Sequence, residues 1–137
     1  MPINGIFGTT VDLLGKTLDL RVKQQEMISA NLANGETPGY VPTTLSFEGQ
    51  LKNALQKGAD VVVTNPRHIP LKKGAHRLAE VSGIVLETPS KSPGPDGNAV
   101  EMETEMSHLA ENQIMYNASI QLLNKKFETL KLAIKGN

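Results

Sequence analysis

Residues 102–134 read METEMSHLAENQIMYNASIQLLNKKFETLKLAI, and this stretch predicts the longest helix of the chain. Its apolar side chains recur at alternating steps of four and three residues, which is the period of a coiled-coil seam. The predicted seam consists of Met102, Met106, Leu109, Gln113, Tyr116, Ile120, Leu123, Phe127, Leu130 and Ile134, of which only Gln113 is not apolar. Such a helix extends for about 50 Å at 1.5 Å per residue, so we expect an elongated molecule.

A second helix is predicted near the N-terminus, because no proline interrupts residues 10–34. Apolar residues again follow steps of three and four, at Val11, Leu14, Leu18, Ile28 and Leu32. Arg21 and Gln25 occupy the seam positions between them, so the middle of this apolar face is weakened. Gly35 and Pro38 predict the end of the helix, and we expect Gly35 to take the left-handed conformation of a helix cap.

The middle of the chain, residues 35–99, is predicted to be irregular and partly β, because it holds all but one of the eight prolines. Residues 47–55 predict one or two amphipathic helical turns. Residues 61–64 (VVVT) and 83–86 (GIVL) predict short strands. Residues 88–98 predict a loop, because three closely spaced prolines there lack the N–H donors that a helix or sheet requires.

The composition argues against several classes of function. Lys plus Arg and Asp plus Glu both number 14, so the chain has no net positive field to attract nucleic acid. The absence of cysteine excludes disulfides, thiolate metal sites and a cysteine nucleophile. No run approaches the roughly 20 apolar residues that span a bilayer, so we expect no membrane insertion. The first residues lack a basic region, and Asp12 interrupts their apolar stretch, so we expect no cleaved signal peptide.

The residues capable of catalysis form no recognisable pattern. No two of His68, His76 and His108 have the (i, i+4) spacing of a helical metal pair. Glu101, Glu103 and Glu105 alternate along a helix and therefore point to different sides, which fits the helix dipole better than an acid–base pair. The chain contains no phosphate-binding glycine motif and no G-x-S-x-G sequence. We therefore predict no catalytic residue, no cofactor, no metal site and no enzymatic activity.

The amide side chains of the two helices form a further pattern. They can donate and accept hydrogen bonds without a charge to desolvate, so they suit repeated contacts between subunits. The alternative is that they are ordinary surface residues. The residues are Gln24, Gln25, Asn31 and Asn34 on the first helix, and Asn112, Gln113, Asn117, Gln121 and Asn124 on the second.

Residues 28–40 read ISANLANGETPGY, and this segment resembles the signature of the flagellar rod and hook axial proteins. The signature residues present here are Asn31, Asn34, Gly35, Thr37, Pro38, Gly39 and Tyr40. Their amides can cap or cross-link backbone at a helix end, and Thr-Pro-Gly favours a turn. Residues 45–48, 96–100 and 109–113, with Tyr116, are similar to segments of the proximal rod members of that family. The resemblance covers about half of the chain.

The resemblance implies a mainly α fold in which long N- and C-terminal helices pair as an antiparallel coiled coil. Residues 1–34 and 100–137 would form the axial coiled-coil core, and residues 35–99 a rod-specific loop and β segment. We expect Val11, Leu14, Leu18, Ile28 and Leu32 to pair with Leu109, Tyr116, Ile120, Leu123, Phe127 and Leu130.

The implied function is structural. A subunit of the proximal rod of the flagellar basal body would assemble through its terminal helices, link the membrane-embedded base to the distal rod and transmit torque. Its expected partners are copies of itself, other rod subunits, the membrane-ring adaptor at the rod base and the flagellar type III export apparatus. It would therefore reach the periplasmic rod without a cleaved signal peptide.

Two alternatives remain at the level of sequence. The chain could be another proximal rod subunit of the same family, although residues 109–116 favour the first interpretation. It could instead be a cytoplasmic coiled-coil export adaptor or chaperone, which leaves the segment from Thr37 to Tyr40 unexplained. Finding the chain in purified basal bodies would reject the adaptor.

Overall fold

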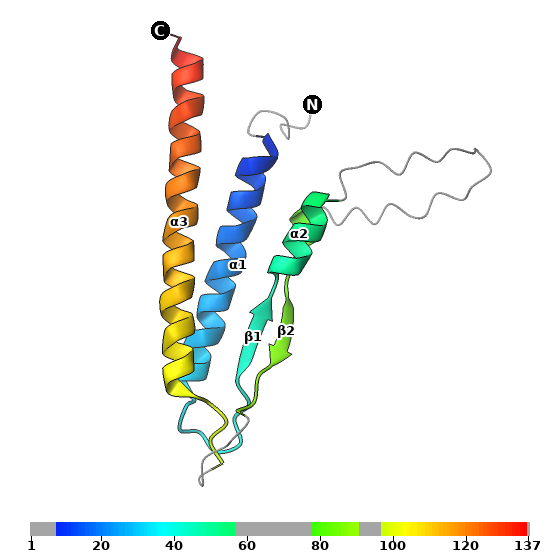
Figure 1. Cartoon of the computed structure of the whole chain (residues 1–137), viewed down its shortest axis with the longest axis vertical. Coiled ribbons are helices and arrows are strands. Elements are labelled where there is room, and N and C mark those ends of the chain that lie inside the picture. The colour runs from blue at the N-terminus through cyan, green and yellow to red at the C-terminus, as the bar shows by residue number, and fades with distance from the viewer. Residues whose placement is uncertain (1–7, 57–77, 91–96, 137) are drawn as a thin grey trace, which may run out of the picture.

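Two long antiparallel helices dominate the computed structural model, which describes residues 8–56, 78–90 and 97–136 (Figure 1). Helix α1 spans Gly8–Ala33 and helix α3 spans Met102–Lys135. The start of α1 and the end of α3 lie at the same end of an elongated molecule (Figure 1). The expected fold class, mainly α with paired terminal helices and a partly β middle, is therefore confirmed.

The elements between the long helices form a small unit beside α1 (Figure 1). Strand β1 (Thr43–Ser46) pairs antiparallel with β2 (Ile84–Glu87), and Leu45 lies opposite Val85. Helix α2 (Glu48–Gln56) and the 3₁₀ turn η1 (Leu78–Glu80) lie along the connection between the strands. The strand expected at residues 83–86 is confirmed, and residues 47–55 are helical over most of their length. The strand expected at 61–64 lies outside the described residues.

The hydrophobic core lies between α1 and this small unit rather than between the two long helices. It consists of Leu20, Leu45, Phe47, Leu51 and Val81, with Leu13, Met27, Ala54 and Leu78 packed around it. Leu13, Leu20 and Met27 are seven residues apart, so they form one line along α1. Helix α1 is thus covered on two sides, by the small unit and by α3. The single apolar face predicted for α1 did not include this second line.

Two amide side chains of α1 complete the hydrogen bonding of β1 on the edge away from β2. Asn31 donates from Nδ2 to the carbonyl of Thr43 at 2.8 Å and accepts from its N–H at Oδ1 at 3.0 Å. Gln24, seven residues earlier, accepts from the N–H of Leu45 at 3.2 Å. An exposed strand edge invites pairing with other chains, and these amides occupy it instead. Gln24 and Asn31 therefore serve the subunit's own fold.

The turn after α1 corrects one prediction about glycine. Gly39 has the left-handed conformation, with φ +76°, whereas Gly35 does not have positive φ. Gly35 is buried, and a Cβ atom placed on it would lie 2.7 Å from Sδ of Met102. Close packing against the flexible side chain of Met102, rather than the backbone dihedral, is what favours a small residue at position 35. The prediction of a left-handed cap at Gly35 was wrong.

Candidate assembly surface on the helix pair

Helix α3 presents two lines of side chains to α1, and each line repeats every seven residues. One line is apolar and half-buried, and consists of Leu109, Tyr116 and Leu123. The other line is polar and buried, and consists of Glu105, Asn112 and Ser119. The heptad period is therefore present in the contact, as expected of a coiled coil, but half of the contacting positions are polar.

The predicted seam shares only its first line with this contact. The second predicted line, Met106, Gln113, Ile120, Phe127 and Ile134, lies one residue further along the chain than the polar line. We call these five residues the flanking line. Ile120 is half-buried, while Met106 and Ile134 are 61% and 82% exposed. Because one residue corresponds to about 100° of helix rotation, the flanking line points beside α1 rather than at it.

The residues predicted to pair across the helices lie as follows. Ile28 is buried, and Val11, Leu14, Leu18 and Leu32 are half-buried. The half-buried residues of this set on α3 are Leu109, Tyr116, Ile120, Leu123 and Leu130. Phe127 is 43% exposed and is the most open of the set.

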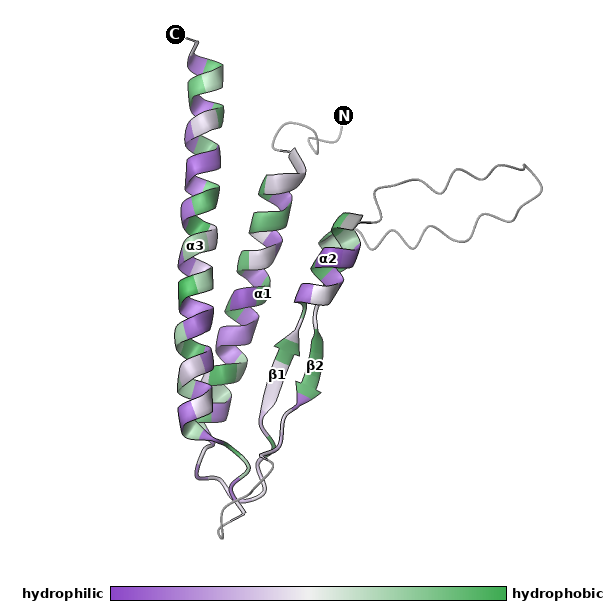
Figure 2. Ribbon diagram, in the orientation of Figure 1, coloured by the Kyte–Doolittle hydropathy of each residue, from purple (hydrophilic) through white to green (hydrophobic). Residues whose placement is uncertain are grey.

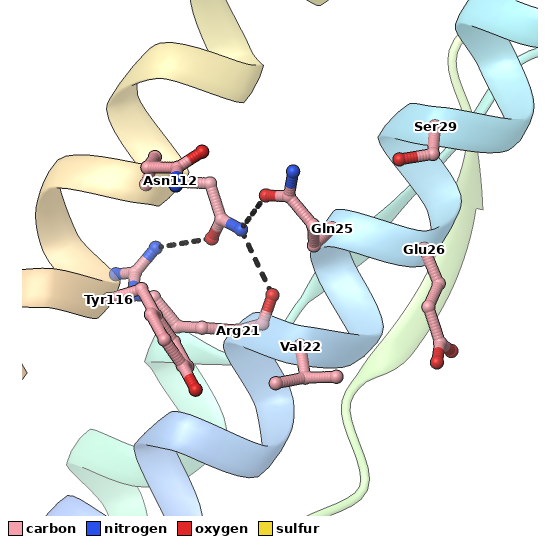
Figure 3. A pocket seen from close by; sticks show the side chains of 8 residues that line it. Arg21, Val22, Gln25, Glu26, Ser29, Asn112 and Tyr116 are labelled. Atoms are coloured by element: carbon pink, nitrogen blue, oxygen red, sulfur yellow. Dashed lines mark hydrogen bonds between the residues drawn. The ribbon is translucent and has the colours of Figure 1, made fainter. Parts of the chain in front are cut away.

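The middle of the helix pair is held by a polar cluster around Asn112, which is 3% exposed (Figure 3). Its Nδ2 donates to the carbonyl of Arg21 and to Oε1 of Gln25, both at 2.9 Å, and its Oδ1 accepts from Nη1 of Arg21 at 3.3 Å. Arg21 also lies with its guanidinium 5.3 Å from the centre of the Phe47 ring, and 3.9 Å from the carboxylate of Glu48. The two residues that weaken the apolar face of α1 thus have specific polar partners.

A second polar cluster lies at the C-terminal end of α1 and contains two signature residues. Asn31, 1% exposed, donates from Nδ2 to Oε2 of Glu105 at 3.0 Å, and the hydroxyl of Tyr40 donates to its Oδ1 at 3.0 Å. Asn34 makes a more local contact, because its Nδ2 donates to the carbonyl of Ala30 at 2.8 Å. The amide of Asn31 therefore joins α1, β1, α3 and the turn at one point.

The remaining signature residues shape the turn itself. The N–H of Thr37 donates to the carbonyl of Asn34 at 2.9 Å, and the N–H of Tyr40 donates to the carbonyl of Thr37 at 3.2 Å. These two bonds reverse the chain, and Pro38 and Gly39 lie exposed between them. The reversal carries Tyr40 back to Asn31 and leads into β1.

A groove of about 490 Å³ lies between α1 and α3 next to the Asn112 cluster (Figure 3). It is lined by Arg21, Val22, Gln25, Glu26, Ser29, Asn112, Gln113 and Tyr116. Val22 is 44% exposed at its edge. Gln113 belongs to the flanking line, so the groove and that line form one continuous surface along the helix pair.

Further apolar residues occupy exposed positions of α3, where hydrophobic and hydrophilic residues alternate along the helix (Figure 2). Ile114, Met115, Leu122 and Leu132 are 68%, 45%, 58% and 73% exposed. Single exposed apolar residues are normal on a protein surface, but here they follow the whole length of one helix, alongside its charged and amide side chains. The surface of α3 therefore has the character of an interface for further helices.

The described residues give no positive indication of another kind of site. Within residues 8–56, 78–90 and 97–136, no group of three or more histidine, aspartate or glutamate side chains is arranged to hold a metal ion. No helix of these ranges combines the length and apolar character that a membrane span needs. His108 is exposed, while His68 and His76 lie outside the described residues. Glu105, assigned to the helix dipole from sequence, instead accepts the buried hydrogen bond from Asn31.

The polar line of α3 was not among the residues predicted to contact α1. The available signal was the spacing of Glu105, Asn112 and Ser119, because polar residues seven apart lie on one side of a helix. The same spacing relates Gln24 to Asn31 on α1. Regular spacing among polar residues is thus as informative as spacing among apolar ones.

Taken together, these features define a structural protein of the helix-packing class, with a helix pair joined by buried hydrogen bonds and large apolar side chains exposed along its longer helix. No family model matches the chain. Several curated proteins named flagellar basal body rod protein FlgB are similar to it. The protein from Cereibacter sphaeroides is 36% identical over 121 residues, covering 88% of this chain and 90% of its own length. The Escherichia coli K12 protein is 33% identical over 115 residues, 80% of each chain.

The protein from Proteus mirabilis HI4320 is 30% identical over 126 residues, which cover 88% of this chain and 89% of that protein. The chain belongs to the FlgB family of flagellar basal body rod proteins.

Proposed function

We propose that this chain is a structural subunit of the flagellar basal body rod and that it assembles through the flanking line and the neighbouring groove. The observation that carries this proposal is the long apolar surface of α3, on which Met106 and Ile134 are 61% and 82% exposed although they belong to one heptad line. The names of the relatives, flagellar basal body rod proteins, support the same assignment.

The occupant of this surface is a long helix of a second copy. From Met106 to Ile134 the flanking line covers 28 steps of the chain, or about 42 Å of helix at 1.5 Å per residue. A partner that follows the line must itself be a long helix with a matching heptad period. Helix α3 of a second copy meets that requirement, with 34 residues and its own exposed apolar side chains.

In the proposed assembly, copies surround the rod axis with their helix pairs and the small β unit lies outside them. The subunit links the membrane-embedded base, through the membrane-ring adaptor, to more distal rod subunits and transmits torque. Repeated helix contacts suit this mechanical role, because many individually modest contacts add along the assembly. Delivery occurs through the flagellar type III export apparatus.

Removing the gene from the source bacterium tests the proposal. The deletion strain should be non-motile in soft agar, and electron microscopy of its basal bodies should show membrane rings without a rod. The wild-type gene supplied on a plasmid should restore both. Complete rods in the deletion strain, or absence of the chain from purified wild-type basal bodies, would reject the proposed function.

A further inference from the structure

Glu105 and Asn112 are buried on α3 one heptad apart, and both make hydrogen bonds across to α1. Glu105 accepts from Asn31 at 3.0 Å. Asn112 donates to the carbonyl of Arg21 and to Gln25 at 2.9 Å. The third residue of the polar line, Ser119, differs, because its hydroxyl donates to the carbonyl of Met115 within α3 at 2.8 Å. Only the first two residues of the line therefore connect the helices.

The apolar contacts alone leave the axial position of α1 along α3 undecided. A heptad pattern matches itself again after a shift of seven residues, so a slipped pair buries similar apolar side chains. The polar contacts do not repeat in this way. In the observed register Asn112 lies between Arg21 and Gln25, whereas a slip of one heptad places it opposite Leu14 and Leu18, or opposite Ile28 and Leu32.

A slipped pair would therefore bury the Asn112 amide among apolar side chains, without partners for its N–H groups and oxygen. Buried amides without hydrogen bonds are strongly disfavoured. The same slip separates Glu105 from Asn31. Asn31 itself would keep its bonds to Thr43 and Tyr40, which do not involve α3.

We infer that Asn112 and Glu105 are register-specifying residues, which fix the axial position of α1 against α3. Their role is to exclude slipped pairings rather than to strengthen the helix pair. A fixed register gives every copy the same relation between the groove, to which α1 contributes, and the flanking line of α3. The inference concerns the single chain, so it holds or fails independently of the proposed place in the rod.

The test measures the distance between two nitroxide labels in the purified full chain by double electron–electron resonance. The chain contains no cysteine, so labels attach only to introduced Thr10→Cys and Glu103→Cys, both at exposed positions. These labels lie far apart along the antiparallel pair, and a slip of one heptad changes their axial separation by about 10 Å. The background with native Asn112 and Glu105 should give a single narrow distance.

The test variant is Glu105→Leu with Asn112→Leu, which makes the polar line apolar. We expect helical circular dichroism to be retained and the distance distribution to broaden or split by about 10 Å. Ser119→Ala, which removes a hydroxyl bonded within its own helix, should keep the single distance. An unchanged single distance in the double variant would overturn the inference.

The single variant Asn112→Leu is measured in parallel. Should the double variant lose its helical signal, a broadened distance in the single variant still supports register specification. Loss of the fold in both variants would overturn the inference, because residues that only exclude slipped pairings are not needed to form the helices.

Discussion

At the scale of single residues, Asn31 has the largest number of structural roles. Its amide makes four hydrogen bonds, two to the backbone of Thr43 and one each with Tyr40 and Glu105. No other common side chain of this size offers two donors and an acceptor in one plane. The signature asparagine thus holds together the turn, the strand and both helices, whereas Asn34 contacts only its own turn.

Asn31→Leu should lower the free energy of unfolding by about 3 kcal/mol, because it leaves several buried polar groups without partners. The matched change Asn34→Leu should cost under about 1 kcal/mol, since Asn34 is less buried and bonds locally. Urea denaturation followed by circular dichroism measures both. Equal losses for the two variants would show that the cross-element bonds of Asn31 add nothing.

The two glycines of the turn are needed for different reasons, which a double-mutant cycle separates. Gly35→Ala should cost under about 1 kcal/mol, because its Cβ would lie 2.7 Å from Sδ of Met102, a flexible side chain that is 46% exposed and can move aside. Met102→Ala should relieve most of that loss. Gly39→Ala should cost about 1 kcal/mol through its φ of +76°, and Met102→Ala should not relieve it, because a Cβ there meets nothing within 4 Å. The free energies of unfolding of the single and double variants decide the matter.

At the scale of elements, α1 is the central member of the fold. Its line of Leu13, Leu20 and Met27 packs into the hydrophobic core, while its other side meets α3 largely through polar contacts. The stability of the chain should therefore depend more on the contact of α1 with the small β unit than on its contact with α3.

Leu20→Ala should lower the free energy of unfolding by about 3 kcal/mol, because it opens a cavity in the core where Leu20 is 3% exposed. Leu122→Ala makes the same change on α3, where the side chain is 58% exposed, and should stay within about 0.5 kcal/mol. Thermal and urea unfolding of the two proteins provides the comparison. A larger loss for Leu122→Ala would contradict the placement of the core.

The sequence predicts the elements well and their contacts only in part. Local patterns predict the two long helices, the strand at 83–86 and the chain reversal after Asn34. All three are present in the structure. The choice of contacting face does not follow, because the apolar seam of α3 was assumed to face α1. Arg21 and Gln25 on α1 favour a polar counterpart, so α3 turns Asn112 toward them and Met106 away. The face of α3 that contacts α1 is thus decided by pairing between the two helices, and no local sequence pattern predicts it.

The same limit applies to the core. Phe47 and Leu51 belong to a short amphipathic segment, but nothing in their own spacing indicates that Leu20, about 30 residues earlier, is their partner. The line of Leu13, Leu20 and Met27 was visible in the sequence as a second heptad line. It competed with the predicted seam that includes Leu14 and Leu18, and only tertiary packing shows that α1 uses both.

At the scale of the whole molecule, stability and assembly are assigned to different surfaces. The core and the polar clusters form within the single chain, whereas the flanking line and the outer side of α3 leave large apolar side chains in solvent. Burying such a surface between copies is favourable by about 25 cal/mol for each Å² of apolar area. Substitutions on the outer surface should therefore separate assembly from folding.

Met106→Glu should leave the unfolding of the purified chain within about 0.5 kcal/mol of wild type, because the side chain is 61% exposed. The same variant should abolish motility, since each subunit contact would have to bury an unpaired carboxylate. Asn53→Glu adds the same charge at an exposed position of α2, in the small unit outside the helix pairs, and should remain motile. Urea denaturation measures the effect on stability, and swimming in soft agar measures the effect on assembly. Full motility of Met106→Glu would show that the flanking line is not part of the interface.

The central claim, that copies of this chain build the rod through the outer surface of their helix pairs, is tested most directly by cryo-electron microscopy of purified basal bodies. The account predicts that the chain fits rod density, with α1 and α3 lining the axis and Met106, Phe127 and Ile134 covered by helices of neighbouring subunits. A map in which the rod contains this chain but leaves the flanking line facing solvent, or one in which the chain is absent from the rod, would contradict it.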